Sequence, residues 1–284
     1  MKLVRFGAKG AEKPGLIDRQ GALRDLSGRV AGIGPAQLLP DGLAHLRVID
    51  PASLPLVPGS PRLGVPVAGI RKIVAIGLNY ADHAAESGAP IPKEPIVFMK
   101  AISSLNGPDD PVIIPKNSVK TDWEVELAVV IGKPARYVEK MDALGHVAGY
   151  CICNDVSERE FQIERGGQWD KGKGADSFAP LGPWLVTTDE IANPQALEMW
   201  LDVNGQPMQR GNTRTMIFDV ATLVSYVSQF MTLETGDVLT TGTPPGVGMG
   251  KKPPVYLKPG DVMTLGIEGL GQQRQVCVAW SPGT

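Results

Sequence analysis

The sequence predicts a mainly β protein with inserted helices, and three observations support this fold class. Residues 121–133, TDWEVELAVVIGK, place an apolar side chain at every second position, as a strand does when one face packs on a core. Short runs of this kind recur between Gly- and Pro-rich turns. Helical segments are few and do not alternate with the strands, so a parallel sheet of β–α–β units is not expected.

Composition and charge exclude several classes of protein. The chain has 284 residues and a net charge of −2, and no run of Lys and Arg favours binding to nucleic acid or to a membrane surface. No apolar run reaches the roughly 18 residues of a membrane-spanning helix, and the N-terminus MKLVRFGAKG lacks the apolar centre of a signal peptide. Cys151, Cys153 and Cys277 are too few for a disulfide framework. These features predict a cytoplasmic protein.

The N-terminal part is predicted to form a small β-rich domain over residues 1–65. Its first 50 residues resemble short strands joined by turns. The stretch PASLPLVPGSPRLGVPVAG, residues 51–69, is dense in Pro and Gly and is typical of a boundary or an extended connector. The remaining residues, 66–284, are predicted to form one larger catalytic domain.

Two hairpins are predicted in the larger domain. In LDVNGQPMQ the pair Asn204-Gly205 separates two short strands and is typical of a type I′ turn. The stretch DVMTLGIEGLGQQRQVCVAW predicts two further strands around residues 269–271. Both patterns indicate antiparallel pairing of neighbouring strands.

Two helices are predicted between the strands. Apolar residues recur at helical spacing over residues 219–233, behind Asp219 as a candidate N-cap. A shorter helix is predicted to begin at Ser157, where SERE has the form of a capping box with Glu160 at its third position.

Two glutamates on the predicted strand 121–133 are candidate metal ligands. Residues i and i+2 of a strand project to the same side with Cα atoms roughly 6.6 Å apart, so Glu124 and Glu126 can converge on one ion. A solvent-exposed face is the alternative, but the apolar Ala128 and Val130 follow on that side and suggest that it is covered. Because unpaired buried carboxylates cost several kcal/mol, two together require a cation such as Mg²⁺ or Mn²⁺.

Asp155 is the candidate third ligand. It follows the apolar run HVAGYCICN, and the shell of a hard cation usually includes a further carboxylate. An aspartate two residues before Ser157 could instead cap a turn. Its place at the end of a strand favours the metal-ligand interpretation.

A histidine–glutamate pair and a lysine are candidate catalytic residues. His83 and Glu86 in LNYADHAAESG lie three residues apart and share a face if the segment is helical. A carboxylate that contacts an imidazole orients it and raises its basicity, as a general base for water requires. Lys173 lies in the Gly-rich stretch KGKGADSF. Taken singly, such a pair is usually a surface contact and such a lysine is usually solvated.

Together these stretches resemble the fumarylacetoacetate hydrolase family. In the order of the family, the resemblance rests on IGLNYADHAAE, PIVFMK, DWEVELAVVIGK, GYCICNDVSERE, KGKGADSFAPLGP and GDVLTTGTPPGVG, roughly residues 70–270. The sequence is most similar to the branch of 2,4-diketo-3-deoxy-L-rhamnonate hydrolases and ureidoglycolate lyase-like proteins. The resemblance implies a mixed β-roll with a small N-terminal domain, a Mg²⁺ site with Mn²⁺ as an alternative, and a homodimer or dimer-based oligomer.

The resemblance also implies roles for nine residues, carried over by position. The metal ligands would be Glu124, Glu126 and Asp155. The catalytic residues would be His83 and Glu86, on a lid that orders over bound substrate, together with Lys173. Gln162, Thr243 and Lys100 would contact the substrate, Thr243 at its carboxylate.

The implied reaction is metal-dependent hydrolysis of a C–C bond in a small 2,4-diketo acid of the acylpyruvate type. His83 would take a proton from a water molecule, which attacks the distal carbonyl, and pyruvate would leave as its enolate beside the metal and Lys173. Decarboxylation of oxaloacetate, isomerisation, hydration and ureidoglycolate lysis remain alternatives on the same scaffold. A sugar-acid-binding protein without catalysis is the alternative from another class, but binding alone needs no general base.

Overall fold

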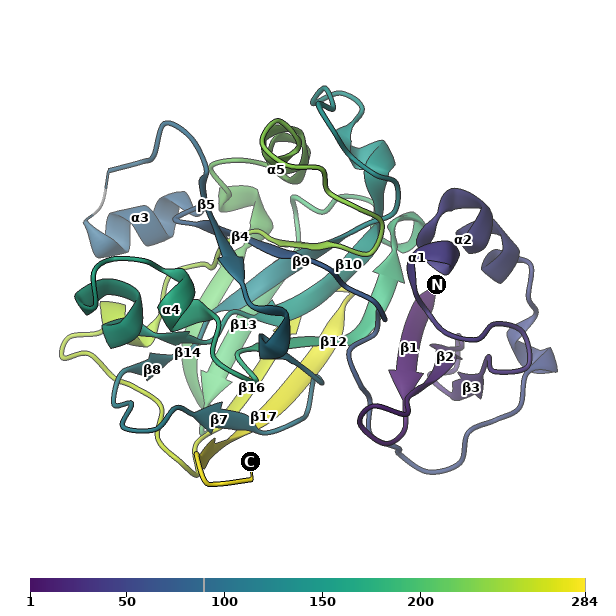
Figure 1. The fold of residues 1–284 in the computed structure, drawn as a ribbon, viewed down its shortest axis with the longest axis horizontal. Helices are drawn as coiled ribbons and strands as arrows, with labels where there is room; N and C mark the ends of the chain where they lie inside the picture. The colour runs from purple at the N-terminus through teal and green to yellow at the C-terminus, as the bar shows by residue number, and fades with distance from the viewer. Residues whose placement is uncertain (89, 284) are drawn as a thin grey trace.

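Two mixed sheets form the framework of the computed structural model, which describes residues 1–88 and 90–283 (Figure 1). The larger sheet has the strand order β3-β2-β1-β12-β10-β9-β15-β4-β5, with β6 paired to β12. Its strands are β1 (Lys2–Phe6), β2 (Lys13–Ile17), β3 (Leu23–Asp25), β4 (Ile73–Gly77), β5 (Ile96–Lys100), β6 (Leu105–Asn106), β9 (Val125–Ile131), β10 (Val147–Asn154), β12 (Ala179–Thr187) and β15 (Val238–Thr240). The mainly β class is therefore confirmed.

The smaller sheet has the order β14-β13-β16-β17-β7, and a third pair joins β8 to β11. These strands are β7 (Val112–Ile114), β8 (Thr121–Asp122), β11 (Ser157–Glu158), β13 (Glu198–Val203), β14 (Gln206–Asn212), β16 (Val262–Ile267) and β17 (Gly271–Ala279). The α-helices of the described residues are short: α1 (Pro35–Leu38), α2 (Pro40–Arg47), α3 (Ala81–Ser87), α4 (Asp170–Lys173) and α5 (Val220–Ser228). No helix in the described part of the chain has the length and apolar character needed to cross a membrane.

Strand β9 is buried on both faces, as its sequence predicts. One set of alternating side chains packs against the smaller sheet and α5 in the first hydrophobic core; it comprises Trp123, Val125, Leu127, Val129 and Ile131. Ala128 and Val130 pack in a second core with residues of the N-terminal segment. Glu124 and Glu126 precede them on this second face, so the fold places two carboxylates on a covered surface.

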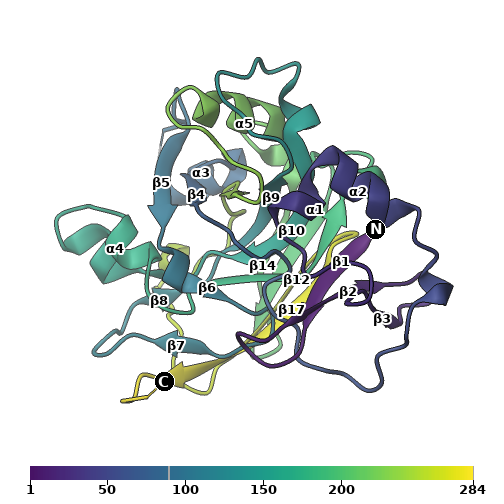
Figure 2. The same ribbon diagram turned by 45° about the vertical axis from the view of Figure 1, so that its right-hand side comes forward.

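The N-terminal strands extend the larger sheet instead of forming a sheet of their own. β1 pairs antiparallel with β12, with Lys2 opposite Val186. The segment lies at one end of this sheet in both views (Figure 2). It also contains α1 and α2, which the sequence analysis did not predict although Pro35 and Pro40 occupy first helical positions, where proline is a start signal. The boundary near residue 65 stays a prediction.

Both predicted hairpins are present. β13 and β14 pair across Asn204 and Gly205, whose φ angles of 53° and 74° are both positive, as a type I′ turn requires. β16 and β17 pair from Ile267 and Gly271 outward. Local turn chemistry therefore sets these two registers.

The predicted helix over residues 219–233 is shorter than expected. Asp219 is its N-cap and accepts a hydrogen bond from the Thr222 N–H (2.7 Å). The helix ends at Ser228 because the following chain turns to pair with another segment, and the Leu233 N–H donates to the Ala135 carbonyl (2.9 Å). Tertiary pairing thus ends the helix before its apolar pattern ends.

The predicted helix start at Ser157 is wrong. Ser157 and Glu158 form β11 and pair with β8. The Ser157 hydroxyl donates to the Asp155 carbonyl (2.8 Å), and the Glu160 N–H donates to Glu158 Oε1 (3.0 Å). A single π-helical turn then covers Glu160–Glu164. A short polar side chain can hydrogen-bond to several nearby backbone groups. Because Ser157 pairs with β8, its hydroxyl bonds to the Asp155 carbonyl and does not form the capping box.

Asp219→Ala should lower the free energy of unfolding by about 1 kcal/mol, because the first turn of α5 loses its side-chain acceptor. Urea denaturation would measure the change. Asp219 also pairs with Lys140 (2.9 Å), an exposed contact of little energetic value. Lys140→Ala is therefore the control, and an equal loss of stability in both variants would contradict the capping role.

Candidate metal centre and active site

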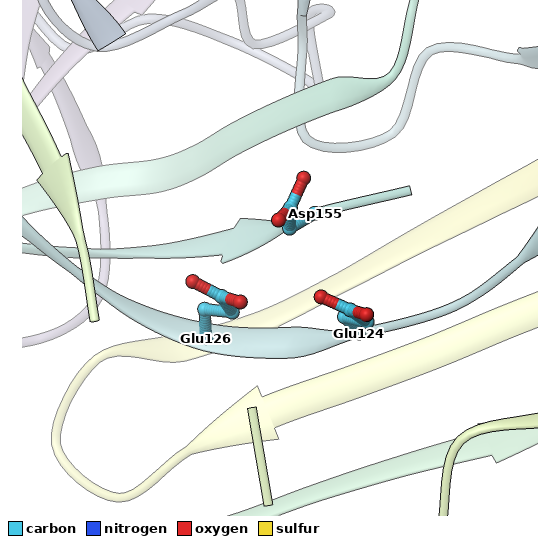
Figure 3. A group of neighbouring side chains, drawn as sticks. All are labelled: Glu124, Glu126 and Asp155. Atoms are coloured by element: carbon cyan, nitrogen blue, oxygen red, sulfur yellow. The ribbon is translucent and has the colours of Figure 1, made fainter. Parts of the chain in front are cut away.

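Three buried carboxylates meet where β9 begins and β10 ends (Figure 3). β10 runs antiparallel to β9 with Asn154 opposite Val125, and the Asp155 N–H donates to the Glu124 carbonyl (2.8 Å). This register brings Asp155 beside the two glutamates. One oxygen each from Glu124, Glu126 and Asp155 lies within 4.8 Å of the others. The structure thus brings together the three ligands proposed from the sequence.

The donor set fits a hard divalent cation. Carboxylate oxygens are the ligands that Mg²⁺ and Mn²⁺ prefer, and these three are shielded from water. Glu126 accepts a hydrogen bond from the Gly242 N–H (2.9 Å) and forms no ion pair with any described residue. A bound cation would provide the partner that this buried carboxylate lacks.

Two buried lysines hold the other carboxylates. Lys173, the last residue of α4, donates from Nζ to Glu124 Oε2 (2.8 Å) and to Asp155 Oδ2 (2.7 Å). Lys100, at the end of β5, donates to Asp155 Oδ1 and to the main-chain carbonyl of Lys173. Both oxygens of Asp155 are thereby fixed, and so is its place in the cluster.

Arg159 connects the cluster to a loop on the other side. Its guanidinium pairs with Glu124 Oε1 (2.7 Å) and with Asp122 Oδ2 (2.8 Å). Asp122 in turn accepts hydrogen bonds from the N–H groups of Gly248 (2.7 Å) and Met249 (3.0 Å). Neither Arg159 nor Asp122 received a role from the sequence, although Arg159 lies in the stretch GYCICNDVSERE and Asp122 begins the stretch DWEVELAVVIGK.

The two glutamates have opposite pKa shifts. Burial alone would raise the pKa of Glu124, but the charges of Lys173 and Arg159 lower it to about 2. Burial raises the pKa of Glu126 well above its ordinary value, and the charges of Asp155 and Glu124 raise it further. The metal-free protein therefore favours the protonated form of Glu126, and a bound cation would favour its ionised form.

The proton on Glu126 should make the free energy of unfolding of the metal-free protein depend on pH. Above pH 4.5, the ordinary glutamate pKa, the unfolded chain releases the Glu126 proton, whereas the native state favours keeping it. The contribution of Glu126 to the free energy of unfolding therefore falls as the pH rises from 4.5 towards the pKa of Glu126 in the folded protein. Glutamine does not titrate. Urea denaturation with chelator should therefore show the free energy of unfolding of Glu126→Gln increasing relative to that of the unsubstituted protein as the pH rises above 4.5, and a constant difference would contradict the raised pKa.

His83 and Glu86 share a face of α3, as predicted. His83 Nδ1 lies 3.2 Å from Glu86 Oε2, so a proton on Nδ1 can be donated to the carboxylate and Nε2 is left as the basic nitrogen. Glu86 also accepts from the Gly246 N–H, at 3.1 and 3.0 Å from its two oxygens. The carboxylate is thus held by a second segment. The lid remains a prediction, and Ala89 within it lies outside the described residues.

A cavity of about 900 Å³ unites these groups. Among the residues proposed from the sequence, its lining includes His83, Glu86, Glu124, Glu126, Gln162, Lys173 and Thr243. Apolar side chains form much of the remaining wall, among them Ile76, Ile96, Phe98, Ile163, Trp169, Val247 and Met249. A volume of this size accommodates a small organic acid.

Lys100 is the predicted substrate contact that the structure places elsewhere. Its side chain is fully buried behind Asp155 and is not among the cavity-lining groups of the described residues. It therefore supports Asp155 and the backbone of Lys173. The sequence offered no signal for this arrangement, because it depends on contacts 55 and 73 residues along the chain.

Comparison with known proteins gives consistent results. Residues 72–278 match the family described as fumarylacetoacetate (FAA) hydrolase, C-terminal. A protein of Burkholderia multivorans, provisionally named a hydrolase, is 62% identical over 277 residues, which cover 97% of this chain and 98% of that protein.

Similar solved structures include hydrolases and an isomerase. A fumarylacetoacetate hydrolase from psychrophilic Exiguobacterium antarcticum has a TM-score of 0.88 and 37% identity. A Mycobacterium abscessus protein, provisionally named a 2-hydroxyhepta-2,4-diene-1,7-dioate isomerase, has a TM-score of 0.81 and 34% identity. A maleylpyruvate hydrolase from Sphingobium sp. SYK-6, solved with manganese(II) and pyruvate, has a TM-score of 0.83 and 28% identity. Each match covers 99% of this chain and 100% of the other.

Proposed function

Because the chain belongs to the fumarylacetoacetate hydrolase family, we propose that it is a metal-dependent hydrolase of 2,4-diketo acids. The reaction would cleave a C–C bond and release pyruvate and a second carboxylic acid. The substrate we propose is 2,4-diketo-3-deoxy-L-rhamnonate or a related sugar acid, with Mg²⁺ or Mn²⁺ as the metal.

One observation carries this proposal. Two glutamates of the carboxylate triad line the same cavity as the histidine–glutamate pair, so a metal held by the triad and a general base can act on one bound molecule. The Sphingobium maleylpyruvate hydrolase, whose structure contains manganese(II) and pyruvate, supports the same pairing of metal and α-keto acid.

The residues of the cavity can divide the reaction among them. A bound cation would supply open coordination positions for the carboxylate and keto oxygens of an α-keto acid and positive charge for the developing enolate. His83 accepts a proton from water at Nε2, while Glu86 orients the imidazole. The water oxygen bonds to the distal carbonyl carbon, and the bond from that carbon to the adjacent methylene breaks. Its electrons form the enolate of pyruvate, which Lys173 stabilises and which then takes up a proton.

Pyruvate release from a panel of diketo sugar acids, acylpyruvates and oxaloacetate tests the proposal. We expect kcat/KM for a 2,4-diketo-3-deoxy sugar acid to exceed that for oxaloacetate by at least about tenfold, on the order of 1.4 kcal/mol. Oxaloacetate is shorter and loses CO₂ without an attacking water, so it cannot use His83 in the same way. Equal or reversed preferences would instead support a decarboxylase.

Isomerisation is the second candidate, because one structural relative is provisionally named an isomerase. Product analysis separates the two, since isomerisation yields no pyruvate and consumes no water. Ureidoglycolate lysis and hydration are tested by adding ureidoglycolate and an unsaturated α-keto acid to the panel, and binding without turnover predicts no product from any member. A homodimer or dimer-based oligomer and a cytoplasmic location also belong to this proposal, and a monomeric mass in solution would contradict the first of them.

A further inference from the structure

We propose that Gln209 is a positioning residue that keeps the main-chain N–H of Thr243 available for the carboxylate of the substrate. The proposal rests on the function above, because it concerns the α-keto acid end of that substrate. Gln209 lies on β14 in the smaller sheet and is fully buried.

At its first residues, β9 has no neighbouring strand among the described residues on the side where β15 pairs with it further along. β15 pairs with β9 from Val130 to Ala128 and ends at Thr240. Both main-chain groups of Glu124 face the end of β10: its N–H donates to Asn154 Oδ1, and its carbonyl accepts from the Asp155 N–H. Successive residues of a strand alternate sides, so the N–H and carbonyl of Val125 face the opposite side, beyond the end of β15.

Two side chains replace the missing strand. The Val125 N–H donates to Gln209 Oε1 (2.9 Å), and the Thr243 hydroxyl donates to the Val125 carbonyl (2.9 Å). Gln209 Nε2 donates to Thr243 Oγ1 (2.8 Å) and to the Pro244 carbonyl (2.8 Å). These four buried hydrogen bonds tie the strand that carries the glutamates to the loop that follows β15.

This network determines which group of Thr243 can bind a ligand. A hydroxyl has one proton, and Thr243 gives it to Val125. If β15 continued beside β9, the main-chain N–H of Thr243 would donate to the Val125 carbonyl. Because the hydroxyl takes that place, the Thr243 N–H has no acceptor within the described residues. Pro244 and Pro245 carry no N–H, so Thr243 offers the main-chain donor of this turn. Thr243 lines the cavity together with Glu126, and an unpaired donor there suits a carboxylate.

The network requires an amide at position 209. Its oxygen must face the Val125 N–H and its NH₂ group must face the Pro244 carbonyl, so these partners determine its orientation. A glutamate would place an acceptor against that carbonyl. An apolar side chain would leave both groups unpaired and release the Thr243 hydroxyl.

Oxalate binding to Mn²⁺-loaded Gln209→Met tests the proposal, because oxalate presents oxygens like those of an α-keto acid. We expect the oxalate dissociation constant, measured by calorimetry, to rise at least about tenfold. The Mn²⁺ dissociation constant, read from the signal of free Mn²⁺ in electron paramagnetic resonance, should change less than about threefold, since the triad is intact.

Gln273→Met is the matched control. Gln273 is 1% exposed and Gln209 is 0% exposed, and each donates two hydrogen bonds from its side-chain amide. Those of Gln273 go to the main-chain carbonyls of Ile152 and Gly182. Within the described residues none of its hydrogen bonds reaches the loop that follows β15, so this variant should retain oxalate affinity. Unchanged oxalate affinity in folded Gln209→Met, a parallel loss of Mn²⁺ affinity, or an equal effect of both glutamine variants would overturn the proposal.

A second pair of variants applies if Gln209→Met does not fold. Thr243→Ser keeps the hydroxyl, whereas Thr243→Val frees the Val125 carbonyl for the main-chain N–H, so the serine variant should bind oxalate about tenfold more tightly than the valine variant. Equal binding by the two would overturn the proposal. Pyruvate release judges the reaction separately, so Gln209-dependent oxalate binding would stand even if no diketo acid were cleaved.

Discussion

Glu126→Gln should abolish tight binding of a divalent cation and lower kcat/KM by at least about a thousandfold, equivalent to roughly 4 kcal/mol of lost transition-state stabilisation. The substitution removes one of three anionic ligands. Glu126 forms no ion pair with the described residues, and the amide oxygen can still accept from the Gly242 N–H, so the fold should be kept. Mn²⁺ titration calorimetry, circular dichroism and pyruvate release measure the three properties.

Asp155→Asn is the contrasting variant. It leaves Lys100 and Lys173 without the full charge of their shared carboxylate, and breaking a buried ion pair costs about 3–5 kcal/mol. This variant should therefore lose stability as well as metal binding. Retained Mn²⁺ affinity in Glu126→Gln, or full activity of the unsubstituted protein with excess chelator, would mean that the triad does not hold the catalytic metal.

His83→Ala should lower turnover by roughly a hundredfold or more, the usual value of a positioned general base. It should still bind Mn²⁺ and oxalate, because the imidazole is not part of the carboxylate cluster. Rapid-quench measurement of pyruvate formation, with oxalate calorimetry alongside, separates the two effects.

His146→Ala is the control for the histidine substitution. His146 is partly exposed, and its Nδ1 contacts the main-chain carbonyl of Pro134 (3.0 Å), so its loss should leave turnover unchanged. If oxalate binding disappears together with turnover in His83→Ala, then His83 supports the site and is not the base.

The sequence by itself determined the features that depend on local periodicity. Alternation along residues 121–133 predicted two buried faces on β9, and the cores on either side of it agree. The Asn204-Gly205 turn and the Asp219 cap are also local, because each involves residues at most a few positions apart. The pairing of His83 with Glu86 follows from one helical turn.

Only the tertiary structure decided how the buried polar groups are paired. Gln209 hydrogen-bonds to Val125, which is 84 residues away in the sequence, and Lys100 hydrogen-bonds to the Lys173 carbonyl, which is 73 residues away. No local pattern encodes such distances along the chain, since a buried donor or acceptor binds whichever partner the fold brings to it. For the same reason Ser157 entered a strand despite its capping sequence, and β1 joined the larger sheet through β12. The carboxylates of the site can therefore be found in the sequence, whereas the groups that orient them emerge only when the sheets are assembled.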